Sequence, residues 1–391
     1  MIEKIVFLLE AQFNKRDYRR FGTETLINNG FIVEFWDFTP FINPLVFAKY
    51  TPPDRLTFEE FKVFDSKSAA IKEIYKLSPK KTLVVTFLSY QIKTIEIYQA
   101  LSFRNILYAS VASGSLPSPV TSKRNVINYI LWKLSKQPLS LIRGIVNRLP
   151  PQWLGVKPMN FVLSGGEKAV KRKPTDIKTN TIHACTFDYD LYLAEKFSSD
   201  SQYEGNIIFL DEYLPFHSNY LQMGVTAPCK PEEYYPPLVT FFERVEAALN
   251  SKIVIAAHPR SSYEKNPDYF GGRKVLRGMT SRLVKQSKCV IAHGSTAISF
   301  AVLYEKPVLL VTLNAIQNYK GYPLAQYYEA MANSLGKKPI NLDELLDIDW
   351  QSELELDRAA YESYRNSYIK SSLAPEKPCW QIFADYVKTI K

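Results

Sequence analysis

The sequence predicts an α/β protein made of two Rossmann-like domains and a C-terminal helical tail. Three observations support this fold class. Short β-branched runs alternate with helical patterns, which is the order of a parallel sheet covered by helices. The alternation starts afresh near residue 206, and 391 residues exceed what one such core usually holds. We expect domains at 1–200 and 201–350, and helices at 351–391 that pack back on the first domain.

In the first domain, buried apolar runs closed by turn-forming residues predict the strands. They are expected at 4–9, 31–36, 82–87, 106–111, 160–163 and 181–185. Helical patterns lie between them, at 17–28, 66–77 and 93–101. The first of these helices is expected to end at Asn29-Gly30, because glycine adopts the left-handed conformation of a helix C-terminus at no steric cost.

The second domain is expected to repeat the same order after the polar linker 198–201. Strands are expected at 206–210, 252–257, 288–292 and 307–311. Helices are expected at 237–250, 280–285 and 296–304, and the chain reads as wholly helical after Trp350.

Composition limits the compartment and the partners. No apolar run is long enough to cross a bilayer, the N-terminus lacks the order of a signal peptide, and the four cysteines are scattered. These features favour a cytoplasmic protein with reduced thiols. A net charge of +10 favours an anionic partner, which we expect to be a nucleotide and a membrane surface rather than nucleic acid.

The segment 123–153 departs from the α/β plan. It interleaves bulky apolar residues with lysine and arginine and contains no acidic residue. Such a basic amphipathic segment suits an anionic membrane surface, although a core or interdomain helix with a solvated basic face would look the same. We expect it to hold the protein on the inner face of the cytoplasmic membrane.

All four histidines fall between His183 and His293, each in a polar patch that closes an apolar run. His258 and His293 directly follow two of the predicted strands. Ligands of open parallel sheets bind outside the carboxyl ends of the strands, so this clustering predicts a site. No histidine or cysteine pair has the spacing of metal ligands on one element, and we expect the protein to need no metal or other cofactor.

Two strand-end segments carry the groups that a phosphate requires. Gly294-Ser295-Thr296 follows His293 and is expected to open a helix, whose first N–H groups would face an anion. His258-Pro259-Arg260 can bring an imidazole and a guanidinium to the same anion.

A His-Pro pair that ends one strand, followed by a small residue, Ser and Thr before a helix and then Lys306-Pro307, resembles the nucleotide-binding domain of GT-B glycosyltransferases. Within that group the chain is most similar to bacterial sialyltransferases and Kdo transferases, which use CMP-activated acidic sugars. The resemblance covers residues 250–312 closely. It implies that His258 and Pro259 contact the donor phosphate and cytidine, and that Ser295 and Thr296 contact the phosphate.

One departure concerns the donor. Many GT-B enzymes with UDP or ADP donors carry Glu-Ala in this helix, where the glutamate holds the ribose; here the pair is Phe300-Ala301. The resemblance therefore favours a CMP donor and a glycan or glycolipid acceptor of bacterial surface polysaccharide synthesis.

Glycosyl transfer needs a carboxylate, either as a base or as a nucleophile. Asp211 ends the first strand of the second domain and is our first candidate, and Asp188 is the second. On the acceptor side, Glu10 ends the first strand of the chain and Arg16 follows it.

Two other functions remain open. The strand-end pattern also resembles UDP-N-acetylglucosamine 2-epimerases, which share the GT-B fold but usually carry acidic residues in the helix that here contains Phe300. A basic binding protein without catalytic activity is the other alternative, and such a protein would not need carboxylates at strand ends.

Overall fold

The computed structural model describes residues 1–49, 51–52, 54–56, 58–119, 149–171, 173–217, 219–220, 225–265, 268–344 and 347–390. The chain forms two compact units. Unit 1 comprises Met1–Ser113, Thr121–Cys185 and Ser371–Lys391, and unit 2 comprises Gly114–Val120 and Thr186–Lys370.

Unit 1 is built on a seven-stranded sheet with the order β3-β2-β1-β4-β5-β6-β7, in which every neighbouring pair is parallel. The strands are β1 (Lys4–Leu9), β2 (Ile32–Asp37), β3 (Phe61–Val63), β4 (Thr82–Thr86), β5 (Leu107–Ala112), β6 (Phe161–Ser164) and β7 (Asn180–His183). β1, β2 and β4 are buried almost throughout, as their β-branched and aromatic composition predicts.

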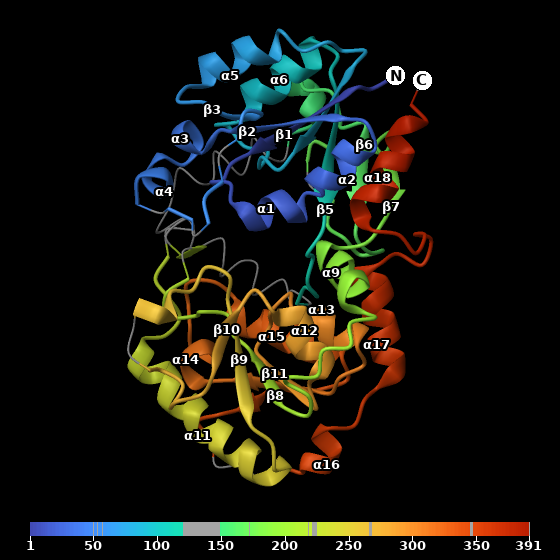
Figure 1. Ribbon diagram of the computed structural model, residues 1–391. Coiled ribbons are helices and arrows are strands. Elements are labelled where there is room, and N and C mark those ends of the chain that lie inside the picture. Colours follow the sequence, from blue (N-terminus) through green and yellow to red (C-terminus); the bar gives the residue numbers. More distant parts are fainter. Residues whose placement is uncertain are drawn as a thin grey trace. The chain divides into compact units, whose positions relative to one another are not determined.

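Helices cover both faces of this sheet (Figure 1). They are α1 (Lys15–Arg20), α2 (Thr23–Asn28), α3 (Thr39–Ile42), α4 (Pro44–Lys49), α5 (Lys67–Ile74), α6 (Ile95–Phe103) and α18 (Cys379–Lys388), with a 3-10 turn η1 at Pro151–Leu154. On one face α5 and α6 contribute to a core with Val6, Leu8 and Val84. On the other face Phe7 stacks on Phe35 and meets the edge of Trp380 from α18.

Unit 2 is built on a six-stranded sheet with the order β10-β9-β8-β11-β12-β13, again with parallel neighbours throughout. The strands are β8 (Ile207–Leu210), β9 (Ile253–Ala257), β10 (Val275–Arg277), β11 (Cys289–Ala292), β12 (Val308–Thr312) and β13 (Ile340–Asn341). The chain adds β9 and β10 on one side of β8 and then crosses to the other side, so the strand order reverses between β8 and β11.

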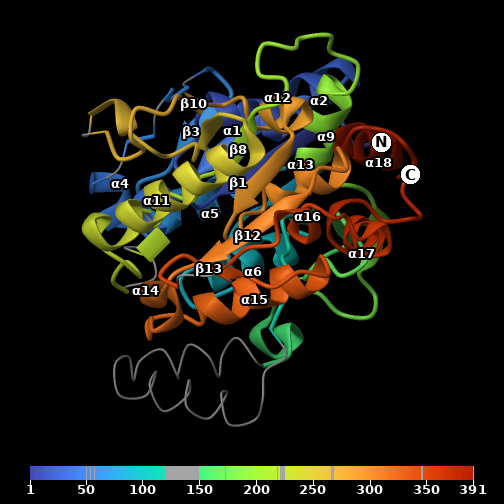
Figure 2. The same ribbon diagram turned by 90° about the horizontal axis from the view of Figure 1, so that it is seen from below.

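The helices of unit 2 lie on both faces of its sheet, with α11 and α15 on one side and α12 and α13 on the other (Figure 2). They are α9 (Phe187–Glu195), α11 (Pro231–Leu249), η2 (Tyr263–Lys265), α12 (Thr280–Gln286), α13 (Ile298–Leu303), α14 (Asn314–Gln317), α15 (Leu324–Ser334), α16 (Trp350–Glu353), α17 (Arg358–Tyr364) and the π-helical turn η3 (Arg365–Ile369).

The predicted fold class is confirmed, since both halves form parallel α/β sheets and the C-terminal segment is helical. The structural units divide the chain differently from the expected boundary at 200, because residues 186–200 group with unit 2. Helices α16 and α17 also belong to unit 2, whereas α18 packs against α2 in unit 1.

Three predicted helices have different limits. The helix expected at 17–28 is broken into α1 and α2, because Gly22 adopts a left-handed conformation with φ +59°. α11 begins at Pro231 rather than at residue 237, and it continues through Pro236 and Pro237. Its buried face, which includes Phe241 and Phe242, offsets the two missing N–H donors. α13 begins at Ile298, two residues later than expected.

The basic segment 123–153 falls mostly outside the described residues, and its docking on a membrane stays a prediction. Of its last residues, Trp153 is described and is 76% exposed. None of the described helices has the length and apolar character needed to cross a bilayer.

Gly22 gives a test of how α18 is held on unit 1. A Cβ at this position would overlap the Trp380 ring, and the left-handed φ already disfavours a side chain. We expect Gly22→Ala to lower the free energy of unfolding by about 2–4 kcal/mol, from the backbone strain and the overpacking together. The midpoint of urea unfolding measures this change. Gly30→Ala is the control, because Gly30 has φ +90° and nothing within 4 Å of its Cβ position, so it should show the strain alone. Equal losses in both variants would contradict the packing argument.

Candidate functional site

The candidate site lies at the carboxyl edge of the unit 2 sheet, where the strand order reverses. β8 lies between β9 and β11, and each of these three strands is followed by a polar loop. The loops begin at Asp211, His258 and His293 respectively. The sequence therefore placed these loops at one edge correctly, because parallel neighbours carry their carboxyl ends to the same side.

Asp211 joins the loop after β8 to the loop after β9. Its Oδ2 accepts a hydrogen bond from the His258 backbone N–H at 3.1 Å. Its Oδ1 accepts from the Tyr213 N–H at 2.8 Å and from the Tyr263 hydroxyl at 3.0 Å. The side chain is 4% exposed, and burial raises its pKa to about 6 although these hydrogen bonds favour the ionised form. Asp211 thus fixes the backbone position of His258.

Glu212 makes the corresponding link on the other side of β8. Its Oε1 accepts from the Gly294 N–H at 2.6 Å, and its Oε2 accepts from the Tyr328 hydroxyl of α15 at 2.8 Å. Burial raises the pKa of Glu212 to about 7, against the effect of these two hydrogen bonds. Only glycine fits at position 294, because a Cβ there would overlap the Tyr328 ring. Two adjacent carboxylates therefore hold both of the predicted ligand loops.

The His258 loop is a tight turn. The Ser261 N–H donates to the His258 carbonyl at 2.9 Å, and Pro259 occupies a position of the turn that its fixed φ favours. The Arg260 N–H donates to His258 Nδ1 at 3.2 Å, which leaves Nε2 to carry the ring proton. The His258 imidazole is therefore oriented so that its Nδ1 accepts within the turn and its Nε2–H donor lies on the opposite side of the ring.

A second histidine joins this loop. The ring of His217, from the segment after β8, lies 4.6 Å from the ring of His258 in an edge-on arrangement. Arg260 donates to the Asn219 side chain at 2.9 Å and so stays in the same group. Burial, and then the nearby Arg260 charge, lower the pKa of His217 to about 4. His217, His258, Asn219 and Arg260 therefore form a cluster that is rich in hydrogen-bond donors and that a bound anion would stabilise.

The other two histidines do not belong to this cluster. The His293 side chain is 0% exposed; its Nδ1 donates to the Val311 carbonyl at 2.7 Å and its Nε2 accepts from Tyr234 at 3.0 Å. Burial lowers its pKa to about 4. Because both ring nitrogens are occupied inside the core, we correct the expectation that the His293 side chain binds the donor. His183 lies in unit 1, where its Nδ1 is 3.1 Å from the Ser371 hydroxyl.

Gly294, Ser295 and Thr296 form a turn that precedes α13. The Ser295 hydroxyl accepts from the Ala297 N–H at 3.2 Å, which is a local turn contact; the N-cap of α13 is Ala297, so the expected serine or threonine cap is not formed. Within the part of the chain that the structure describes, the backbone N–H groups of Ser295 and Thr296 have no hydrogen-bond partner. Two adjacent backbone donors in a turn provide a place for an anion.

The remaining predicted residues lie elsewhere. Asp188 is in the first turn of α9, near Tyr364, where burial and then neighbouring charges including Asp188 raise the tyrosine pKa. Glu10 and Arg16 belong to unit 1. Glu10 accepts from the Ser89 N–H and hydroxyl at 2.9 and 2.6 Å, and Arg16 is exposed on α1.

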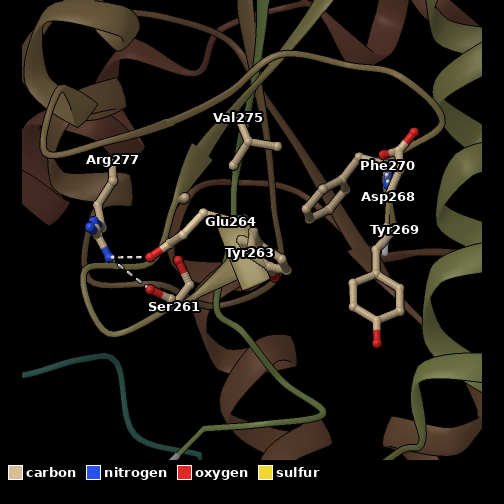
Figure 3. Close-up of a pocket in the computed structure, with 9 residues that line it drawn as sticks. Ser261, Tyr263, Glu264, Asp268, Tyr269, Phe270, Val275 and Arg277 are labelled. Carbon is tan, nitrogen blue, oxygen red and sulfur yellow. Dashed lines mark hydrogen bonds and ion pairs between the residues drawn. The ribbon is translucent and has the colours of Figure 1, made fainter. Parts of the chain in front are cut away.

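A cavity of about 560 Å³ lies beside the His258 loop, against β10 (Figure 3). Arg277 lies close to Glu264 and the Ser261 carbonyl, and Tyr269 and Phe270 line another part of the wall. Sequence reasoning missed this cavity, because the loop that forms it carries no strand-end pattern. It also missed Tyr328 and Tyr263, whose hydroxyls reach the two carboxylates from distant segments. In the described residues no three histidine, cysteine or acidic side chains are grouped so that they could hold a metal ion.

Comparisons with known proteins give structural similarity only. No family model matches the sequence, and no curated protein is similar to it. Among solved structures, the chain is similar to Staphylococcus aureus MnaA in a co-structure with UDP, at 12% identity and a TM-score of 0.49, over 100% of this chain and 98% of that one. A putative UDP-N-acetylglucosamine 2-epimerase from Listeria monocytogenes gives 12% identity and 0.48, over 99% and 94%. MurG from Acinetobacter baumannii gives 9% identity and 0.46, over 99% of both chains. None of these three is described as a sialyltransferase or a Kdo transferase.

Glu212 predicts a specific dependence of stability on pH. Its pKa rises from 4.5 to about 7 on folding, so the folded state binds this proton more tightly than the unfolded state. The resulting stabilisation is complete below pH 4.5 and is lost as the pH rises through 7. Asp211 acts in the same direction between pH 3.8 and 6. Because glutamine cannot ionise, the free energy of unfolding of Glu212→Gln relative to wild type should increase by about 1–3 kcal/mol from pH 5 to pH 8. Urea unfolding at the two pH values measures this, and an unchanged difference would contradict it.

Proposed function

We propose that unit 2 binds a nucleotide sugar and that the protein is a nucleotide-sugar-dependent glycosyltransferase. One observation carries the proposal: the adjacent carboxylates of Asp211 and Glu212 hold the His258 loop and the Gly294 turn at the reversal point of the sheet. Ligands of open α/β sheets bind at this point. The resemblance of residues 250–312 to GT-B glycosyltransferases supports the same interpretation.

The donor phosphate would lie across the end of β8. On the β9 side, His258 Nε2–H and the Arg260 guanidinium supply charge-assisted hydrogen bonds. On the β11 side, the N–H groups of Ser295 and Thr296 supply uncharged donors. The two sides are separated by two strand spacings, roughly 10 Å, which a phosphate covers together with the group attached to it.

The nucleoside would occupy the cavity beside the His258 loop. Its volume of about 560 Å³ is within the range of small-molecule sites, and its wall combines the ring of Tyr269 with Arg277 and Glu264. Aromatic faces bind a planar base, and the charged groups can bind the polar edge of the base.

The nature of the base is tested separately. Phe300 is 3% exposed in α13, so no carboxylate reaches outward from that position to hold a ribose. CMP and UDP carry the same ribose, so the preference for CMP rests on the resemblance alone. UDP is included in the experiment because, of the three similar structures named above, one contains UDP and one is named for a UDP sugar.

A thermal-shift series with CMP, CDP, UDP and GDP tests the proposal, because a ligand that binds only the folded state raises the melting temperature. The corresponding nucleotide sugar is then incubated with and without glycan or glycolipid acceptors. Release of nucleotide that depends on the acceptor supports a transferase. Isomerisation of the sugar without an acceptor would identify an epimerase. A melting temperature that no nucleotide raises would favour a binding protein with another ligand.

His258→Ala tests the phosphate contact. Loss of a charge-assisted hydrogen bond costs about 1.5–3 kcal/mol, so nucleotide affinity should fall about tenfold or more. Isothermal titration calorimetry measures the affinity. His183→Ala is the matched control, because it removes a histidine that bonds to Ser371 in unit 1. Wild-type affinity in a folded His258→Ala variant would remove His258 from the site.

Asp211→Asn separates two roles of this residue. The Asp211 oxygens are occupied by three donors inside the fold, so we propose that Asp211 acts by positioning His258 and not as the base. An asparagine has a single acceptor oxygen. Either the Tyr213 N–H or the His258 N–H would then face the donor NH2 group of the asparagine and lose its hydrogen bond. Nucleotide affinity should therefore fall along with turnover. A base or nucleophile would instead lose turnover at unchanged affinity. Asp188→Asn serves as the comparison, because a catalytic Asp188 would show that second pattern.

A further inference from the structure

Glu212 contacts the Gly294 turn directly, so its charge would interact with an anion bound to that turn. Its carboxylate contacts the Gly294 N–H at 2.6 Å, and the next two backbone N–H groups are those of Ser295 and Thr296. A phosphate on these donors would stand close to the carboxylate of Glu212, a partly buried residue, and both groups carry negative charge. A like charge this close disfavours the ionised form of the carboxylate.

Both protonation states of Glu212 can keep the turn in place. The ionised carboxylate accepts from Gly294 and from the Tyr328 hydroxyl. A protonated carboxyl group still accepts from Gly294 through its carbonyl oxygen, and its O–H can donate to the Tyr328 oxygen, since a phenol both donates and accepts. Protonation therefore changes the charge at the turn without removing either contact.

The groups around Glu212 do not neutralise it. Its own strand end supplies Asp211, whose charge raises the pKa of Glu212. Tyr328 of α15, Tyr234 of α11 and Tyr220 face it, and each of these tyrosines has its pKa raised by burial first and also by the Glu212 charge. The Arg260 cation is held with His217 and His258 at the His258 loop, on the other side of β8 from the Gly294 turn. Burial places the pKa of Glu212 at about 7, so its charge state is sensitive to a nearby anion at neutral pH.

We propose that Glu212 takes up a proton from solvent when the donor phosphate binds to the Gly294–Thr296 turn, so that nucleotide binding is linked to protonation. The inference rests on the proposed function of unit 2 and adds a regulatory property to the same site. The carboxylate gains the proton, no other covalent bond changes, and the hydrogen bond with Tyr328 reverses its direction. Affinity for the donor then falls as the pH rises above neutrality, and a more alkaline medium favours nucleotide release.

Calorimetry measures the linkage directly. The probes are UDP-N-acetylglucosamine and CMP-N-acetylneuraminate, whose diphosphate and phosphodiester groups hold no proton between pH 6 and 9. Titrations at pH 7.5 in two buffers with different heats of ionisation give the number of protons taken up. We expect uptake of a fraction of a proton, up to one, and a dissociation constant that rises by up to about tenfold per pH unit above 7.

Two variants assign the proton. Glu212→Gln should lose most of the uptake, bind with little dependence on pH, and bind more tightly than wild type at pH 8.5. Glu246→Gln is the matched control, because Glu246 also accepts a backbone N–H, from Ile253 at 2.8 Å, but at the opposite end of β9. It should lower the melting temperature and leave proton uptake unchanged.

The outcomes separate this inference from the proposed function. If neither nucleotide sugar binds to wild type at pH 6 or pH 8.5, both are overturned. Binding without proton uptake overturns only the linkage. Uptake that persists in Glu212→Gln also overturns it, and assigns the proton to His258 instead.

Discussion

Each of the two sheets carries a carboxylate that crosses the point where its strand order reverses. In unit 1, Glu10 follows β1 and accepts from the Ser89 N–H in the loop after β4. In unit 2, Glu212 follows β8 and accepts from the Gly294 N–H in the loop after β11. Beyond the strand ends the ladder of backbone hydrogen bonds stops, and the loops on the two sides leave in opposite directions. A side chain that binds the neighbouring backbone N–H therefore decides where these loops stand.

In unit 2 this arrangement is reinforced by a second carboxylate. Asp211 binds the His258 N–H toward β9, so one dipeptide fixes loops on both of its sides. Burying two carboxylates side by side is unfavourable, and their raised pKa values express that cost. Backbone N–H groups and tyrosine hydroxyls offset part of it, because they satisfy the oxygens without adding charge. Hydrogen bonds therefore fix the backbone of the two loops, while the charge of Glu212 changes near neutral pH.

The histidines show why a sequence cluster is a weaker guide than a contact. All four follow apolar runs, yet they have three different roles. His217 and His258 lie together near Arg260, His293 is bonded on both nitrogens inside the core, and His183 belongs to unit 1. Hydrophobic periodicity locates the end of a strand. It does not tell whether the residue there points into the core or out of it.

The sequence by itself determined the two parallel sheets, most of their strands, and the edge at which His258 and Ser295 lie. The spacing of apolar residues is a local property that locates each strand. The parallel order of the strands then places their carboxyl ends at one edge. The sequence did not determine the break at Gly22, where the backbone is left-handed and Trp380 fills the space that a Cβ would need. Nor did it determine the role of Glu212, whose partners Gly294 and Tyr328 lie 82 and 116 residues away. Such contacts were decided only by the tertiary structure, since distant backbone donors and hydroxyls leave no periodic pattern in the chain.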